Sequence, residues 1–325
     1  MKAWQFTQVH QPLSLNEVDE PTARPGHVVL DVKAAGLCHS DVGMMEDPHF
    51  PFPPGGPRPM TVGHEIAGVI SQIGEGVEGW NVGDRVGVCM TTDPAPGLSA
   101  HGGFAPQVEC TADFLVRIPE GLPYAVAAAA TDSGVAPHHA VVVVGEVTNG
   151  TKVGILGIGG LGQMGARIAV LAGAEVFVAE PREEIWHVAR ELGAVDVARD
   201  ISEFADKELD VIIDFAGVGN STTAAIETVR PGGRVVQVGM SKRTAEISTY
   251  AVVTRRLSLL GTMGGWRSDL ESVYALMAAG ELTPVVSTIT FDEIPDGLAR
   301  LSRGEVVGRL VALLDEPTTE SVRAN

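Results

Sequence analysis

The sequence predicts an α/β protein with two parts, an irregular β-rich domain and a doubly wound domain built on a parallel sheet. Its 325 residues exceed what one hydrophobic core usually serves, which favours two domains. Up to about residue 130, short β-like runs alternate with Gly and Pro turns. From about 130 to 265, buried strand-like runs alternate with helical patterns, as in a parallel sheet covered by helices on both faces.

The β-rich domain is predicted at residues 1–133 and 266–325. Its N-terminus, MKAWQFTQ, is typical of a first strand, and turn residues such as Arg24-Pro25-Gly26 separate the later runs. Further strands are predicted at 27–33, 66–73, 85–88 and 308–314, and helices at 269–279 and 295–302. From Glu316 on, the chain has the polar composition of a frayed end.

The doubly wound domain is predicted at residues 134–265. Its apolar runs are short and rich in Val and Ile, as expected of strands buried on both faces. Strands are predicted at 152–156, 175–179, 209–215, 234–238 and 257–260, and helices at 161–172, 182–192 and 222–229.

Composition excludes several classes of function. The chain has 41 acidic and 23 basic residues, a net charge of −18, so its field repels nucleic acids and anionic lipid surfaces. The most apolar region, 124–147, is interrupted by Asp132, Pro137, His138 and His139, which argues against a membrane span. The N-terminus lacks the apolar stretch of a signal peptide, and three cysteines form no framework of paired spacings. We therefore expect a cytoplasmic protein.

A glycine-rich turn between a strand and a helix indicates dinucleotide binding. In Gly157-Ile158-Gly159-Gly160-Leu161-Gly162, the first glycine permits a tight turn, the second a close approach to a diphosphate, and the last close packing of helix on strand. The first turn of the helix, with Gly160 and Leu161, then presents free N–H groups to the diphosphate. Such turns also occur without a nucleotide, so the motif alone is weak evidence.

Glu180 strengthens the prediction and indicates which coenzyme is bound. It ends the second strand, 23 positions after Gly157 (180 − 157), where a carboxylate can accept hydrogen bonds from both ribose hydroxyls. A 2′-phosphate beside it would be repelled, which favours NAD over NADP. Arg182 points the other way, because it could pair with that phosphate. The alternative for Glu180 is a solvated loop carboxylate.

Cys38 and His64 are side chains that zinc prefers, although 26 positions separate them. Taken alone, Cys38 is more often a small buried apolar residue and His64 a hydrogen-bonded core histidine. Only the fold could bring them together.

These residues nevertheless stand within a set of motifs that resembles the zinc-binding medium-chain alcohol dehydrogenases over nearly the whole chain. The motifs are GLCHSD, GHEIAG, GDRV, GGFAP, GIGGLG, DFAGVG and RPGGRVVQVG, and their order and separations agree as a set. ATDSGVAPHHA resembles the branch that contains bacterial secondary-alcohol dehydrogenases. The resemblance implies a GroES-like catalytic domain joined to a Rossmann domain.

The resemblance also implies a catalytic zinc ion held by Cys38, His64 and Asp132. Asp132 stands where many relatives have Cys, and its alternative is a helix N-cap. Glu65 could also approach the metal, as His138 and His139 could on sequence proximity alone.

Further roles follow from the matched positions. Asp41 would hold the ligand histidine. Ser40 would bind the substrate oxygen and begin a proton relay, with a turn serine as the alternative. His39 and Arg309 match residues that contact the coenzyme diphosphate, although either could be a surface residue.

Three departures from the family pattern matter. No C-x-x-C run occurs between Cys89 and Gly102, so the lobe that binds a structural zinc ion is absent and we expect one zinc ion per chain. Gly43 replaces the histidine that completes the proton relay in many relatives, leaving His39, His49 or water for that role. Ala136 replaces a threonine near the nicotinamide.

The expected function is hydride transfer between NAD(H) and an alcohol, ketone or aldehyde, with zinc lowering the pKa of the alcohol. A Met-, Phe- and Pro-rich segment, 44–60, together with Met90, could form an apolar pocket and so favours hydrophobic secondary alcohols, although core packing explains it equally. The rivals are a zinc-free enoyl or quinone reductase using NADPH, and a non-catalytic nucleotide-binding protein. We expect small-molecule substrates, no nucleic-acid or membrane partner, and a homo-oligomer, dimer or tetramer.

Overall fold

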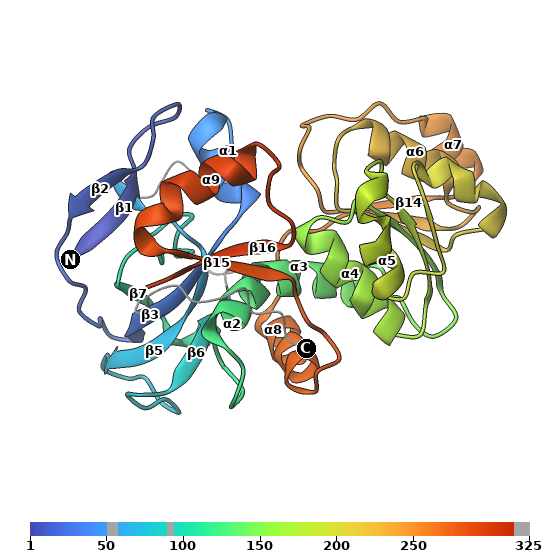
Figure 1. Cartoon of the computed structure of the whole chain (residues 1–325). Coiled ribbons are helices and arrows are strands. Elements are labelled where there is room, and N and C mark those ends of the chain that lie inside the picture. The colour runs from blue at the N-terminus through green and yellow to red at the C-terminus, as the bar shows by residue number, and fades with distance from the viewer. Residues whose placement is uncertain (51–57, 90–93, 315–325) are drawn as a thin grey trace. The chain divides into compact units, whose positions relative to one another are not determined.

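The computed structural model describes residues 1–50, 58–89 and 94–314. The chain forms two compact units, one of Met1–Asp132 with Trp266–Asn325 and the other of Ser133–Gly265. The division lies one residue from the predicted boundary after residue 133. Figure 1 shows the strands of the first unit in blue to cyan and red, and those of the second in green to orange.

Two sheets form the first unit. A small sheet has the order β2-β1-β4. The larger sheet has the order β15-β16-β3-β5-β6-β8, with β7 paired to the first part of β3. Their bounds are β1 Lys2–Phe6, β2 Ser14–Glu17, β3 His27–Leu37, β4 Met60–Thr61, β5 Glu65–Ile73, β6 Arg85–Val88, β7 Gln107–Thr111, β8 Leu115–Arg117, β15 Val286–Thr290 and β16 Arg309–Leu313.

The long strand β3 is central to this unit, because it pairs antiparallel with β5, β7 and β16. Its apolar side chains, with those of β5, form a core that includes Leu30, Ile66 and Phe104. Four helices belong to the unit, among the residues described: α1 His39–Glu46, α2 Tyr124–Ala129, α8 Arg267–Ala278 and α9 Ile294–Ser302. Strand β15 was not predicted, although its sequence, VSTIT, is rich in β-branched residues.

The second unit contains a parallel six-stranded sheet of order β11-β10-β9-β12-β13-β14. The order reverses at β9, as in doubly wound folds, so the predicted α/β class is confirmed. The strands are β9 Lys152–Leu156, β10 Glu175–Ala179, β11 Asp196–Ala198, β12 Val211–Asp214, β13 Arg234–Gln237 and β14 Ser258–Gly261. The three-residue strand β11 was not predicted.

Helices flank this sheet, and one predicted helix is divided. The unit has α3 Val135–His138, α4 Gly160–Leu171, α5 Trp186–Glu191, α6 Asn220–Thr228 and α7 Thr249–Thr254. The short helices α3 and α7 were not predicted. The helix predicted over 182–192 is split into a 3₁₀ turn, Glu183–Ile185, and α5, because Ile185 has non-helical backbone angles. The hydrophobic core of the second unit includes Phe177, Ile201 and Ile212.

The apolar region 124–147 is helical but irregular. In the first unit α2 continues into a π-helical turn, Ala130–Gly134, whose residues up to Asp132 belong to that unit. In the second unit α3 continues into another π-helical segment, His139–Val144. Among the residues described, no helix combines the length and apolarity needed to span a membrane.

Candidate metal and dinucleotide sites

Four metal-donor side chains converge in the first unit. Cys38 follows β3 and precedes α1, His64 directly precedes β5, Glu65 is its first residue, and Asp132 lies in the π-helical turn after α2. One donor atom from each residue lies within 4.8 Å of the others, and all four residues are buried. The fold thus brings together side chains that are far apart in the sequence.

The donor atoms suit a zinc ion. Cys38 Sγ lies 3.2 Å from Asp132 Oδ2, and His64 Nε2 lies 3.9 Å from the same oxygen. His64 Nε2 is buried and, among the described residues, has no hydrogen-bond partner. A buried polar atom without a partner costs free energy, and a metal ion would supply that partner. Sulfur, imidazole nitrogen and carboxylate oxygen together form a ligand set that zinc accepts.

Asp41 connects two of the donors. Its Oδ1 lies 3.1 Å from His64 Nδ1, and its Oδ2 accepts a hydrogen bond of 2.9 Å from the backbone N–H of Cys38. With Nδ1 donating to Asp41, Nε2 carries the lone pair that faces the other donors. The buried carboxylate therefore orients both the histidine and the turn that carries the cysteine.

The surroundings of His64 favour its protonated form when no metal competes. Burial alone would lower its pKa, but the charge of Asp41, and the nearness of Asp132 and Cys38, hold the pKa of His64 well above its usual value. The site therefore attracts a cation, either a proton or a metal ion.

Arg309 lies among these donors. It starts β16, is 4% exposed, and donates from both Nε and Nη2 to Glu65. Nη2 also donates to Asp132 Oδ2 at 2.6 Å. The family motifs predict a contact of Arg309 with the coenzyme diphosphate but not these contacts, because nothing in the sequence around Arg309 indicates residues 65 and 132 as its partners.

The other residues predicted near the metal lie around the first turn of α1. Ser40 is half-buried and its hydroxyl makes no hydrogen bond to another described residue, whereas His39 is exposed. The aromatic ring of Phe50 packs against Gly43 so closely that a side chain there would overlap it. A histidine at position 43 would therefore require Phe50 to move. His138 and His139 belong to the second unit and not to the donor group.

The glycine-rich turn lies between β9 and α4 in the second unit. Gly157 has a φ of +81°, which favours glycine, and a Cβ on Gly162 would overlap the carbonyl oxygen of Gly157. A Cβ on Gly159 would meet no heavy atom within 4 Å. Gly159 caps α4 without a side-chain hydrogen bond, so the N–H groups at Gly160 and Leu161 remain available to a phosphate.

Glu180 follows β10 and is buried next to this turn. It accepts hydrogen bonds from the backbone N–H of Ile158 at 3.1 Å and from Arg182 Nε at 2.9 Å. Burial would raise the pKa of Glu180, but the bonds from Arg182 and from the backbone N–H groups lower it below its usual value. Arg182 is therefore paired with Glu180.

Asp214, at the carboxyl end of β12, was missed as an individual residue. It is fully buried and accepts hydrogen bonds from Ser221 Oγ at 2.7 Å, Thr222 Oγ1 at 2.9 Å and the backbone N–H of Gly217 at 2.8 Å. It thereby shapes the DFAGVG loop at the edge of the sheet where doubly wound folds bind ligands. The motif itself was the available signal.

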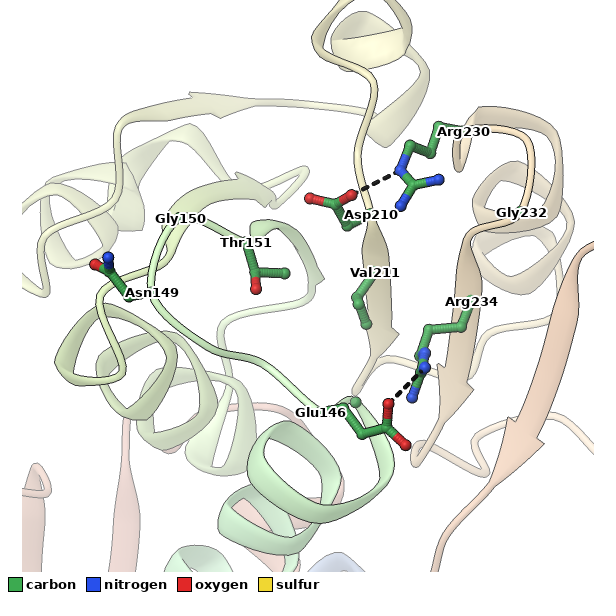
Figure 2. Close-up of a pocket in the computed structure, with 10 residues that line it drawn as sticks. Glu146, Asn149, Gly150, Thr151, Asp210, Val211, Arg230, Gly232 and Arg234 are labelled. Atoms are coloured by element: carbon green, nitrogen blue, oxygen red, sulfur yellow. Dashed lines mark hydrogen bonds and ion pairs between the residues drawn. The ribbon is translucent and has the colours of Figure 1, made fainter.

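A separate polar pocket of about 340 Å³ lies at the opposite, amino-terminal edge of that sheet (Figure 2). Arg230 bonds Asp210 at 2.6 Å, and Arg234 bonds Glu146 at 2.8 Å. Arg234 also donates to the carbonyl of Val144, which attaches the end of the π-helical segment to β13. The two ion pairs neutralise the charges of these arginines, and none of the predicted site residues lines the pocket.

Comparisons with known proteins agree with this architecture. The family model described as "Alcohol dehydrogenase GroES-like domain" matches residues 24–120, and the one described as "Zinc-binding dehydrogenase" matches residues 160–279. An alcohol dehydrogenase of Geobacillus stearothermophilus is 29% identical, over 97% of this chain and all of that protein.

Two solved structures are similar over nearly their full length. Acetophenone reductase from Geotrichum candidum, in complex with NAD, is 27% identical with a TM-score of 0.88, over 97% of each chain. The alcohol dehydrogenase of Aeropyrum pernix is 27% identical with a TM-score of 0.87, over 96% of this chain and all of that one.

The chain therefore belongs to the zinc-type medium-chain alcohol dehydrogenase family, as its motifs predicted. It is an alcohol dehydrogenase-type oxidoreductase, and zinc and NAD are the kinds of cofactor that these matches support.

Proposed function

We propose that this enzyme is a zinc-dependent, NAD(H)-linked oxidoreductase that interconverts hydrophobic secondary alcohols and ketones. The observation that carries the proposal is the convergence of Cys38, His64 and Asp132, in which the buried Nε2 of His64 has no hydrogen-bond partner among the described residues. A zinc-free reductase or a simple nucleotide-binding protein has no need of this arrangement. We propose one zinc ion per chain, because the described residues contain one such donor group.

The residues of the chain have separate tasks in this proposal. When bound, zinc supplies a Lewis acid for the oxygen of an alcohol or carbonyl, and the nicotinamide accepts or returns the hydride. Asp41 holds the tautomer of His64. Ser40, whose hydroxyl makes no hydrogen bond to another described residue, accepts the proton of the substrate hydroxyl and releases its own proton outward. The next carrier is His39, His49 or water.

Coenzyme binding is assigned to the second unit. The N-terminus of α4 binds the diphosphate, which approaches over Gly159, where no side chain stands. Glu180 binds the ribose hydroxyls, and its negative charge disfavours a 2′-phosphate. Because Arg182 already pairs with Glu180, we propose NAD rather than NADP.

The preference for secondary alcohols and ketones rests on the relatives, one of which is an acetophenone reductase. Met44 and Met60 are buried in the core of the first unit, so these two side chains serve packing rather than an open pocket. Residues 51–57 and Met90 lie outside the described residues. We propose a homo-oligomer, which a mass measurement in solution would test.

Elemental analysis combined with kinetics tests the proposal. We expect about one zinc ion per purified chain, oxidation of secondary alcohols with a kcat/KM that favours NAD over NADP, and loss of turnover in Cys38→Ala and His64→Ala while NADH binding persists. A zinc-free active enzyme would favour the enoyl or quinone reductase alternative. Normal turnover in either variant would contradict the assigned ligands, and a kcat/KM that favours NADPH would contradict the coenzyme.

A further inference from the structure

Asp132 reaches the metal donors from an irregular part of its helix. It lies in the π-helical turn that begins at Ala130, directly after α2. Asp132 Oδ2 is 3.2 Å from Cys38 Sγ and 3.9 Å from His64 Nε2. Because a zinc–oxygen bond is only about 2.0–2.2 Å long, a shift of the turn by about 1 Å would take this carboxylate out of a shared ligand set. The conformation of the turn therefore decides whether Asp132 is a ligand.

Two buried hydroxyl groups bond the backbone where α2 meets this turn. A π-helical turn closes its hydrogen bonds over one residue more than an α-helix, which interrupts the regular ladder and lets side chains bond the carbonyl groups there. Tyr274 Oη donates to the carbonyl of Ala127 at 3.0 Å. Thr131 Oγ1 donates to the carbonyl of Ala128 at 2.8 Å. Thr131 belongs to the turn itself, whereas Tyr274 comes from α8, 147 residues from Ala127.

The surroundings of Tyr274 leave space for its hydroxyl and keep it a donor. A Cβ on Gly87 of β6 would overlap Tyr274 Oη and would lie 3.1 Å from the methyl group of Thr131. The hydroxyl and the turn thus pack over one strand position that has no side chain. Burial raises the pKa of the Tyr274 hydroxyl above its usual value, so the group stays protonated. A phenylalanine would fill the same volume without the hydrogen bond, so it is the hydroxyl that connects α8 to α2.

We propose that Tyr274 is a positioning residue for the metal ligand Asp132, which it stabilises in place by donating to the carbonyl of Ala127. The inference rests on the proposed zinc function. It gives a task to α8, a helix that contributes no side chain to the group of metal donors. Its consequence is that a helix from the later part of the chain controls the geometry of a ligand from the earlier part.

Tyr274→Phe in the full-length enzyme tests this role, because it removes the hydroxyl and keeps the ring. Without that donor the turn can relax toward a regular helix, which moves Asp132 away from the metal. We expect zinc release to a chromophoric chelator to be about tenfold faster or more, and kcat to fall by about tenfold or more. The visible absorption of the cobalt-loaded variant should also change, because that spectrum reports the ligands. A hydroxyl that only stabilised the fold would lower resistance to denaturant and leave this spectrum unchanged.

Tyr124→Phe is the matched control. Tyr124 is the first residue of α2, and its hydroxyl makes no hydrogen bond to another described residue. The substitution therefore removes a tyrosine hydroxyl from the same unit without affecting the turn, and zinc release and the cobalt spectrum should stay unchanged.

A double variant tests whether Tyr274 acts through Asp132. In Asp132→Asn the carboxylate is already lost, so the addition of Tyr274→Phe should change the rate of zinc release by less than about twofold. Effects that multiply in full would mean that the hydroxyl acts on the metal site by another route, and would overturn the inference.

Unchanged zinc release and an unchanged cobalt spectrum in folded Tyr274→Phe would also overturn the inference, while leaving the zinc function standing. If that variant fails to fold, Gly87→Ala decides, because its methyl group displaces the hydroxyl and leaves the tyrosine in the chain. Faster release and an altered cobalt spectrum in Gly87→Ala support the inference, and unchanged values overturn it. Absence of zinc from the unaltered enzyme would instead overturn the proposed function, and this inference with it.

Discussion

Glu180 combines burial with a persistent negative charge. Hydrogen bonds from Arg182 and from the backbone N–H of Ile158 stabilise the ionised form, which outweighs the cost of burial. A pKa lowered in this way means that the proton leaves below the ordinary value of 4.5. The carboxylate is thus ionised at every pH above that value, and its contribution would be lost only as the pH falls below it.

From this we expect the preference for NAD over NADP to be constant between about pH 7.5 and 9, where the 2′-phosphate of NADP, with its second pKa of about 6, is fully ionised as well. Glu180→Gln should raise the KM for NAD about tenfold or more, because a hydrogen bond to a charged acceptor contributes about 1.5–3 kcal/mol. Steady-state kinetics with both coenzymes across this range measure both effects. Glu184→Gln, on an exposed neighbour, is the control. A preference that titrates within that range would contradict the assignment.

Ser40 is the residue whose loss should affect chemistry more than binding. Ser40→Ala should lower kcat about a hundredfold, the usual scale of a lost proton-transfer group, with a smaller change in KM. Ser40→Thr retains a hydroxyl and should recover most of the rate. If kcat is unchanged in the alanine variant, Ser40 has no part in proton transfer.

At the scale of elements, the connection between β9 and α4 contains one glycine needed for packing, Gly162, and another proposed to lie against the coenzyme, Gly159. Gly162→Ala places a methyl group against the carbonyl of Gly157, so the helix must shift, at a cost of about 1–3 kcal/mol in the free energy of unfolding. Gly159→Ala meets no neighbour. Its methyl group instead lies where the diphosphate approaches.

We therefore expect opposite effects from the two substitutions. Denaturant unfolding should show a loss of stability for Gly162→Ala and almost none for Gly159→Ala. Titration with NADH, followed by fluorescence, should show weaker binding for Gly159→Ala despite its normal stability. Normal coenzyme affinity in Gly159→Ala would place the diphosphate elsewhere.

For the whole molecule, the two proposed cofactors belong to different units. All four metal donors lie in the unit of Met1–Asp132 and Trp266–Asn325, and the glycine-rich turn and Glu180 lie in Ser133–Gly265. A ligand stabilises the structure that binds it, by about 4 kcal/mol at a thousand times its Kd. Zinc and coenzyme should therefore protect different parts of the chain.

Hydrogen exchange before and after zinc removal by a chelator measures this. We expect faster exchange in α1, at the start of β5 and in the π-helical turn that holds Asp132, with little change in β9, β10 and β12. Addition of NADH should slow exchange at the start of α4 instead. Equal loosening of both units on zinc removal would contradict separate sites.

The sequence by itself determined the features that depend on local patterns. Strands β6, β9 and β10 were predicted to the residue, because short apolar runs bounded by turn residues are signals within a few positions. The Gly157–Gly162 turn was found in the same way, because its glycines lie within six consecutive residues between a strand-like and a helix-like run. Family membership followed from many short motifs in the correct order, and the comparisons confirm it.

Only the tertiary structure decided which distant side chains meet. Cys38 and Asp132 are 94 residues apart, and Arg309 is 244 residues from Glu65, so no spacing predicts their contacts. The contact between Arg309 and Glu65 arises because β16 pairs with β3, and β3 with β5, which places residues from both ends of the chain in one sheet. Hydrogen bonds between strands set that register, and it is the register that joins the buried arginine to the metal donors.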